Sequence, residues 1–148
     1  MPQLSLHSPV GDLTVFEDEG HIVALEWGWG SDQLSSPLLA RTKAALEAYF
    51  DGQALPDDLP LRPHGTAYRQ KVWGELRRIP PGQTRTYREI SALAGGSARS
   101  VGGANAANPI PILIPCHRVV ATVGLGGYSG ADGLDTKRAL LAIERIGA

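Results

Sequence analysis

The sequence predicts an α/β (α+β) protein in which a small mixed domain, residues 1–63, precedes a mostly helical domain, residues 64–148. Strand-like runs are confined to the first 29 residues, and most helix patterns follow residue 64. A proline-rich segment, residues 53–65, lies where the charge changes sign. Residues 1–65 carry three basic and ten acidic residues, whereas residues 66–148 carry eleven and five. A basic half favours a polyanionic partner, although chance also produces such a bias.

The amino-terminal part begins with two short strands. LTVF (13–16) and IVALEW (22–27) are apolar runs separated by an acidic turn. A helix is expected next, because Ser36 can cap it, Pro37 suits its first turn and Gly52 lies just past its end. Residues 53–65 hold three prolines without any period. They predict either a linker or an ordered crossover.

The carboxy-terminal part predicts three helices in succession. Residues 66–79 place one apolar stripe on a helix: Tyr68, Val72, Trp73, Leu76 and Ile79. Thr86 and Glu89 form a capping box for a helix that ends at Gly95, and another helix follows and closes at Asn108–Pro109. Two short helices joined by a glycine-containing turn match a helix-turn-helix.

The second helix of this pair is unusual because it consists mostly of Gly, Ala, Ser and Asn. Its two adjacent glycines each cost a helix about 1 kcal/mol relative to alanine. Close approach of the helix backbone to another large body would explain such a thin helix.

The remaining segments predict a buried strand at IPILI (110–114), a second extended piece at HRVVA (117–121) and a final helix at 134–147. Asp135 is a candidate cap for that helix, and Leu140, Ile143 and Ile146 lie on one side of it. The GLGG run between them lacks the ending of a phosphate-binding loop.

Composition excludes several classes of protein. No stretch of about 18 apolar residues is present, so we expect no membrane span. The first residues lack the pattern of a secretory signal. A single cysteine excludes an internal disulfide and a cysteine-based zinc site, while four histidines leave a histidine site formally open. A reducing, cytoplasmic location is expected.

Cys116 is the only cysteine, and His117 and Arg118 follow it directly. A free thiol titrates near pH 8.5, so a nucleophilic role needs a nearby base and a group that orients the base. In an extended strand His117 would point away from the sulfur, so a turn at Pro115–Cys116 or a bridging water is required. Glu144 is the candidate orienting carboxylate, because it lies off the apolar stripe of the last helix. From spacing alone, an inert core cysteine is the simpler interpretation.

Several motifs in the same order resemble one known family. PCHRVV, preceded by NPIPILI and followed by GGYSG, is similar to the active-site segment of the O6-alkylguanine-DNA alkyltransferases, also called methylated-DNA–protein-cysteine methyltransferases. VWGELRRIPPGQTRTYREIS, ARSVGGANAANP and the closing K…LL…E also resemble the family pattern, so the likeness covers roughly residues 64–146. SPVGDLTV is the best match in the more variable first domain. The resemblance implies an RNase H-like first domain and a winged-helix or helix-turn-helix DNA-binding second domain.

The resemblance also implies roles for residues of the reaction centre. It makes Cys116 the alkyl acceptor, His117 the base acting through a water, and Glu144 the residue that orients His117. Asn108 takes the position of a hinge between the recognition helix and the cysteine segment.

A second group of positions is implied to bind DNA and the damaged base. Tyr87 matches the tyrosine that contacts a DNA phosphate and gives a proton to the leaving guanine. Arg99 matches the arginine that enters the duplex in place of the flipped nucleotide. Val119 and Ser129 match backbone positions that line the guanine pocket.

The implied function is direct-reversal DNA repair by a monomer. The alkyl group of O6-alkylguanine in double-stranded DNA moves irreversibly to the cysteine, without cofactor or metal, and O4-alkylthymine is a second candidate substrate. Three alternatives stay open: a non-catalytic alkylated-DNA-binding protein, a helix-turn-helix regulator and a cysteine hydrolase. The sequence departs from the family at Ser100, where alanine is usual, and in a longer loop between Tyr128 and Lys137, which leaves the accepted alkyl groups open.

Overall fold

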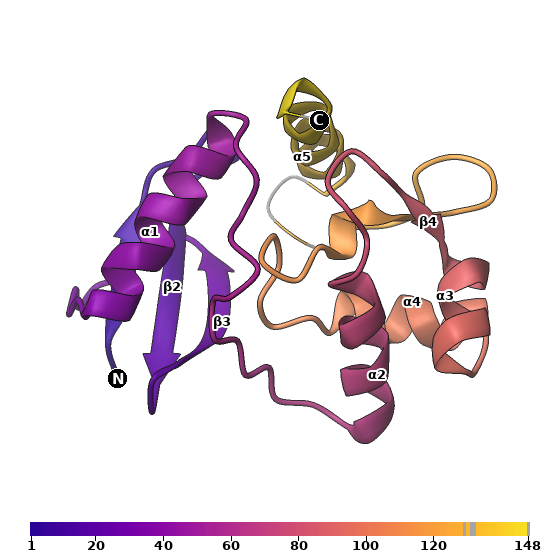
Figure 1. The fold of residues 1–148 in the computed structure, drawn as a ribbon, viewed down its shortest axis with the longest axis horizontal. Helices are drawn as coiled ribbons and strands as arrows, with labels where there is room; N and C mark the ends of the chain where they lie inside the picture. Colours follow the sequence, from indigo (N-terminus) through magenta and orange to yellow (C-terminus); the bar gives the residue numbers. More distant parts are fainter. Residues whose placement is uncertain (129, 131–132, 148) are drawn as a thin grey trace.

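The computed structural model describes residues 1–128, 130 and 133–147 of the chain. A three-stranded sheet and the helix that follows it form one half of the molecule, and further helices with a short two-stranded sheet form most of the other half (Figure 1). The predicted α/β class, with a sheet domain before a helical domain, is confirmed. In the described residues no helix is long and apolar enough to cross a membrane.

The amino-terminal sheet consists of β1 (Gln3–Leu6), β2 (Leu13–Asp18) and β3 (His21–Trp27), which are antiparallel in the order β1-β2-β3. The sequence predicted β2 and β3 but missed β1, because four residues are too short for alternation to stand out. Helix α1 (Pro37–Phe50) packs on this sheet and is capped by Ser36 as predicted, because the Ser36 side chain accepts from the backbone amide of Leu39. Apolar side chains between the two layers are buried: Leu6, Leu13, Val15, Leu25, Leu39 and Leu46.

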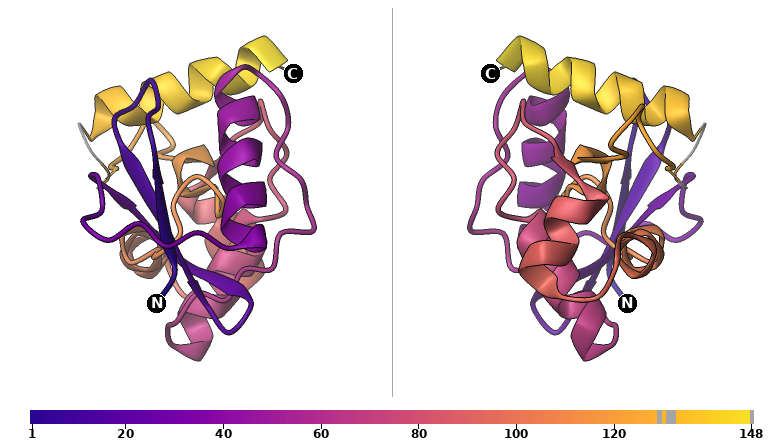
Figure 2. Two further views of the ribbon diagram at one scale, coloured as in Figure 1. Left: turned by 90° about the vertical axis from the view of Figure 1, so that its left-hand side faces the viewer. Right: turned by 90° about the vertical axis from the view of Figure 1, so that its right-hand side faces the viewer.

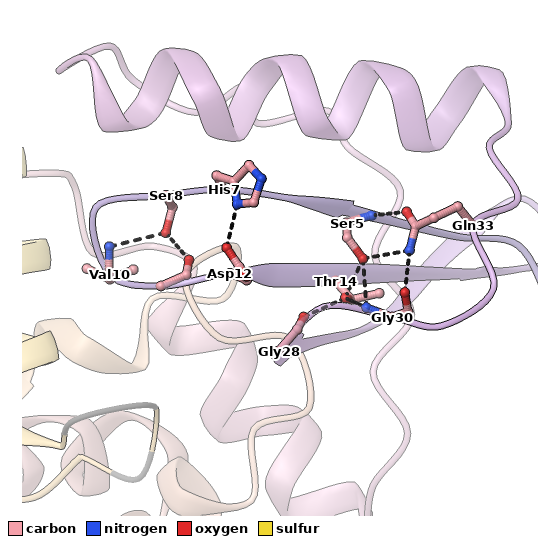
Figure 3. Close-up of polar contacts among 10 residues, drawn as sticks. Ser5, His7, Ser8, Val10, Asp12, Thr14, Gly28, Gly30 and Gln33 are labelled. Atoms are coloured by element: carbon pink, nitrogen blue, oxygen red, sulfur yellow. Dashed lines mark hydrogen bonds and ion pairs between the residues drawn. The ribbon is translucent and has the colours of Figure 1, made fainter.

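A buried polar cluster fixes the loop that joins β3 to α1 (Figure 3). The hydroxyls of Ser5 and Thr14 lie 2.8 Å apart, and Thr14 donates to the carbonyl of Gly28. The amide of Gln33 accepts from the Ser5 backbone nitrogen and donates to the Ser5 hydroxyl and to the carbonyl of Gly30. These contacts hold the loop against the sheet, because buried polar groups need partners.

The proline-rich segment that follows α1 is an ordered crossover. The amide of Ile22 donates to the carbonyl of Pro60 at 2.8 Å, and the amide of Arg62 donates back to the carbonyl of Ile22 at 2.8 Å. The segment therefore extends alongside β3 before it leads into α2, as Figure 1 shows. Of the two predicted alternatives, the ordered crossover is correct.

Helix α2 (Ala67–Leu76) is shorter than the predicted range of 66–79, although its predicted buried stripe is present at Val72, Trp73 and Leu76. The indole nitrogen of Trp73 donates to the carbonyl of Ala104 at 2.8 Å and ties α2 to α4.

Helices α3 (Tyr87–Ala94) and α4 (Ala98–Ala106) pack against each other and against α2. The capping box of Thr86 and Glu89 is formed as predicted, and Ser97 and Ser100 form a second one that starts α4. The turn between the helices uses Gly96 at φ 77°, where an added Cβ would lie 2.5 Å from the Tyr68 hydroxyl. Local signals of caps and turn glycines thus produced the helix-turn-helix.

The predicted strand at residues 110–114 is wrong. These residues form a compact turn in which Ile112 adopts φ 73°, and its amides bond within the turn, from Ile114 to Ile110 and from Leu113 to Pro111. Prolines 109, 111 and 115 have no amide hydrogen, so this apolar run cannot build a strand ladder. Of the predicted extended piece at 117–121, β5 (Val119–Val120) is a strand and pairs in parallel with β4 (Arg85–Thr86).

Helix α5 (Leu134–Gly147) lies across one end of the molecule, against both halves (Figure 2). It starts at Leu134, so Asp135 lies in its first turn and is not its cap, contrary to our expectation. Its buried face consists of Thr136, Lys137, Leu140, Leu141 and Glu144. The expectation that Glu144 lies away from the packed face is therefore wrong. The carboxylate is buried there because other buried polar groups bond to it.

Candidate active site

The cysteine lies in a single 3₁₀ turn, η1 (Cys116–Arg118), rather than in a strand. The amide of Arg118 bonds to the carbonyl of Pro115 at 3.0 Å and closes a turn at Pro115–Cys116, one of the two arrangements that the sequence left open. Strand alternation therefore does not separate Cys116 from His117. Both side chains are buried, Cys116 with 5% of its surface exposed and His117 with none. The amide of Asn105 on α4 donates to the carbonyl of Cys116 at 3.1 Å and anchors the turn to that helix.

Asn108 braces the segment between α4 and the cysteine. Its side-chain nitrogen donates to the carbonyl of Ile114 at 2.9 Å, and its oxygen accepts the amide of Ile110 at 3.0 Å. One side chain thus holds both ends of the 110–114 turn. The same side chain also interacts with the Cys116 thiol and lowers its pKa.

Glu144 is the centre of a buried hydrogen-bond network. Its Oε2 accepts from His117 Nε2 at 2.6 Å, from an Arg118 terminal nitrogen at 2.8 Å and from the Tyr49 hydroxyl at 2.7 Å. Its Oε1 accepts from Arg118 Nε at 2.9 Å. Burial opposes ionisation of this carboxyl, but the hydrogen bonds from His117 and Arg118 outweigh it and lower the Glu144 pKa to about 2. The carboxylate is therefore charged across the physiological range.

Burial shifts the pKa values of the Cys116 thiol and the His117 imidazole in opposite directions. Burial raises the pKa of Cys116 to about 11, although the side chain of Asn108 and the charge of Lys137 pull it down. Burial lowers the pKa of His117, and the contacts with Glu144 oppose that change. At neutral pH the thiol is protonated and the imidazole is neutral. His117 Nδ1 is buried without a hydrogen-bond partner in the described part of the chain, so it can accept a proton.

Two cavities meet at Cys116. One, of about 260 Å³, lies toward the helix-turn-helix and is lined by Tyr87, Gly102, Asn105, Ala106, Cys116, Gly127 and Tyr128. The other, of about 220 Å³, reaches the end of β3 and is lined in part by Trp27, Asn108, Pro111, Cys116 and Gly130. Cys116 therefore borders two cavities, although only 5% of its surface is exposed.

Tyr87 begins α3 and is half-buried, and burial raises its pKa. The charged end of Lys137 lies 5.9 Å from the centre of the Tyr87 ring. A Cβ built on Gly126 would lie 2.8 Å from the Tyr87 ring, so the backbone of the loop that contains Gly126 passes close to this ring. The structure thus brings Tyr87 to the first cavity together with Cys116.

The other predicted DNA-site residues that the structure describes lie elsewhere. Arg99 is exposed in the first turn of α4, away from the buried network. Val119 is buried and lines neither cavity at Cys116, and its carbonyl accepts from Lys137 Nζ at 2.6 Å. Ser129 lies outside the described residues, as do residues 131, 132 and 148.

Three residues of this region were not singled out from the sequence. Arg118 also donates to the carbonyl of Ile79 at 2.6 Å, and its position directly after Cys116-His117 was a usable signal. Lys137 donates to the carbonyls of Val119 and Gly127, and burial lowers its pKa to about 8. It precedes Glu144 by two helical turns, so the two share one face. Tyr49 gave no local signal.

The likeness to known proteins covers nearly the whole chain. Residues 67–146 match the family described as "6-O-methylguanine DNA methyltransferase, DNA binding domain", and residues 4–63 match its "ribonuclease-like domain". The chain belongs to this methyltransferase family. A constitutive methylated-DNA–protein-cysteine methyltransferase of Bacillus subtilis is 39% identical over 94% of this chain and 92% of its own length. One from Methanosarcina acetivorans is 38% identical over 93% and 94%.

A solved methyltransferase structure has the same fold. The Mycobacterium tuberculosis OGT crystallised in complex with DNA superposes with a TM-score of 0.88, at 37% identity over 100% of this chain and 95% of that one. The resemblance led us to expect alanine at position 100, but Ser100 here completes the α4 capping box and bonds to the Tyr68 hydroxyl at 2.8 Å. The departure therefore stabilises the start of α4. Among the residues that the structure describes, no three His, Cys, Asp or Glu side chains gather as a metal site would require.

Proposed function

We propose that this protein repairs alkylated DNA by direct reversal, transferring the alkyl group of O6-alkylguanine to Cys116 in a single irreversible turnover. The observation that carries the proposal is the buried arrangement of Cys116, His117 and Glu144 beside two cavities. Its relatives are named methylated-DNA–protein-cysteine methyltransferases, and one neighbour was crystallised with DNA.

The reaction begins with the thiol, whose pKa of about 11 keeps it protonated at rest. His117 accepts that proton at Nδ1 through one bridging water, and Glu144 stabilises the imidazolium that forms. The sulfur lone pair then forms a bond to the alkyl carbon. The bond from that carbon to O6 breaks, its electron pair stays on the guanine oxygen, and the guanine takes up one proton. A thioether on Cys116 remains, and no group of the site can reverse it.

The damaged base must leave the duplex to reach a buried sulfur, which costs a few kcal/mol of stacking and pairing. The cavity next to α4 is the candidate site for that base, because Tyr87, Tyr128 and Cys116 all line it. Tyr87 is the candidate donor of the proton to guanine. Residues 1–63 and 64–148 act in this proposal as a supporting domain and a DNA-binding, reacting domain, and the protein acts as a monomer in the cytoplasm.

Helix α4 is the proposed contact with the minor groove. A Cβ built on Gly102 or Gly103 meets no described atom within 4 Å, so the fold itself gives no reason for glycine at either position. A partner outside the chain, approaching closely, supplies that reason. Exposed Arg99 on the same helix then fills the space left by the flipped nucleotide.

Other functions explain fewer of these features. A helix-turn-helix regulator has no use for the buried network at Glu144, and a non-catalytic DNA-binding relative has no use for an acceptor cysteine. A cysteine hydrolase turns over many times. These functions are distinguished by titrating the protein with duplex that carries radiolabelled O6-methylguanine. We expect label transfer to stop at one methyl group for each chain. Continued release with excess substrate would favour a hydrolase, and no transfer would favour a binding protein.

A further inference from the structure

The amino-terminal domain contacts the reacting network through one side chain. Tyr49 lies near the end of α1, is 2% exposed and donates its hydroxyl to Glu144 Oε2 at 2.7 Å, across 95 residues of sequence. Among the described residues it is the only side chain of residues 1–63 with a hydrogen bond to Glu144, His117 or Arg118. In Figure 2 the carboxy-terminal end of α1 lies against α5, which carries Glu144.

The hydrogen bond from Tyr49 reaches one particular oxygen of the Glu144 carboxylate. Tyr49 bonds to Oε2, the same oxygen that accepts from His117 Nε2. A hydrogen bond from the tyrosine withdraws charge from that oxygen and leaves less of it for the imidazole. Burial, followed by the neighbouring Glu144 charge, raises the Tyr49 pKa strongly, so the hydroxyl keeps its proton and remains a donor at every pH of interest.

We infer that Tyr49 is a positioning residue for alkyl transfer: its hydroxyl orients the Glu144 carboxylate and limits the charge that Glu144 presents to His117. The inference rests on the proposed function, because it gives Tyr49 a part in activating Cys116. It also gives the amino-terminal domain a direct contribution to the chemistry, beyond its contribution to the fold.

The pKa values of the groups around His117 allow its titration to be distinguished from theirs in a pH profile. Cys116 and Arg118 of η1 and Glu144 and Lys137 of α5 surround His117. Tyr49 of α1 acts on His117 through Glu144. Tyr128 faces Cys116 from the loop before α5. The pKa of Glu144 is lowered to about 2 and that of Lys137 to about 8, whereas that of Cys116 is raised to about 11. Burial lowers the pKa of His117 from its usual value, so His117 is the group of this network expected to titrate on the acidic side of neutrality.

The experiment measures single-turnover methyl transfer from free O6-methylguanine to the intact protein between pH 5 and 8. Because the substrate is the free base, differences in DNA binding do not affect the comparison between variants. Tyr49→Phe is expected to move the acidic limb of the profile to higher pH by about 0.5 to 1 unit, because the lost hydrogen bond leaves more charge on Glu144 for protonated His117. Replacing Tyr49 with 3,5-difluorotyrosine, a stronger donor, is expected to move the same limb to lower pH.

Thr42→Val is the matched control. It also removes a buried hydroxyl from α1, but among the described residues Thr42 bonds only within that helix, to the carbonyl of Leu38. Its profile is expected to coincide with that of the wild type. A cavity of about 230 Å³ reaches both Tyr49 and Glu144, so the carboxylate of the phenylalanine variant can be solvated and the fold is expected to survive. The protein with 3,5-difluorotyrosine keeps the hydroxyl, so it tests the inference even if Tyr49→Phe unfolds.

Two results would overturn the inference. One is an acidic limb that stays in place in both Tyr49 proteins, and the other is a limb that moves equally in Thr42→Val. Failure of the proposed function has a different signature, because the wild-type protein itself would then gain no methyl group on Cys116.

Discussion

The imidazole of His117 and the carboxylate of Glu144 are joined by a 2.6 Å hydrogen bond between Nε2 and Oε2 in the interior of the protein. The bond fixes the imidazole with Nε2 toward the carboxylate, which leaves Nδ1, unpartnered among the described residues, to accept a proton. Arg118 bonds to both oxygens of the same carboxylate. Glu144 therefore holds the imidazole in place and also neutralises the buried Arg118 cation.

The double role of Glu144 predicts two effects of Glu144→Gln. Methyl transfer from duplex DNA is expected to slow at least about tenfold, because the imidazolium loses its counter-charge. The free energy of unfolding is expected to fall by about 3 kcal/mol, because Arg118 is left buried without its ionic partner. Single-turnover rates and urea unfolding measure the two effects separately. An unchanged rate in the folded variant would remove the orienting role.

The same carboxyl predicts the acid sensitivity of the fold. The Glu144 pKa is lowered to about 2 in the folded protein, so its stabilising contribution is present above the usual value of 4.5. The contribution is lost as pH falls from about 4.5 toward 2, and it amounts to about 3 kcal/mol. The difference in unfolding free energy between wild type and Glu144→Gln should therefore shrink from pH 6 to pH 3. A constant difference over that range would contradict the assignment.

The exposed arginine of α4 predicts a variant that fails to flip the base but keeps the chemistry. In Arg99→Ala the extruded state loses its support, so a few kcal/mol of flipping cost goes uncompensated. Duplex substrate should then react more slowly by a factor of about ten for each 1.36 kcal/mol. Free O6-methylguanine needs no flipping and should react at nearly the wild-type rate. An equal loss on both substrates would show that Arg99 supports the pocket or the fold instead.

The cavity next to β3 predicts a limit on alkyl size. The Trp27 indole donates to the carbonyl of Val10 at 3.1 Å, and its ring meets the Tyr128 ring edge-on. A Cβ built on Gly130 would lie 2.7 Å from the Trp27 ring. Trp27→Leu should enlarge this cavity and raise the rate with O6-benzylguanine relative to O6-methylguanine by about tenfold. Trp29→Leu is the control, because Trp29 is exposed and stacks on His7. An unchanged ratio in Trp27→Leu would assign alkyl selection to other residues.

Features with local causes could be predicted from the sequence. Thr86 and Glu89 are three residues apart, and their capping box forms as the spacing requires. A strand would separate Cys116 from His117, so the sequence predicts either a turn or a bridging water between them, and the turn is present as η1.

Features with distant causes could not be predicted. IPILI has the composition of a buried strand, but its prolines and the brace from Asn108 turn it back on itself. Glu144 is expected away from the packed face because it lies off the apolar stripe of the last helix, whereas Arg118, His117 and Tyr49 together stabilise it inside. No sequence spacing indicates that Tyr49 meets Glu144, since that contact depends on how α1 and α5 pack.

The most direct test of the account is the intact mass of the protein after incubation with duplex DNA that contains O6-methylguanine, followed by peptide mapping. The thiol nucleophile predicts a single gain of about 14 Da, located on Cys116, and no gain in Cys116→Ser. The serine variant should still bind the damaged duplex, because only the sulfur is consumed. A wild-type protein of unchanged mass, or a methyl group found on any other residue, would contradict the assignment of Cys116 as the acceptor.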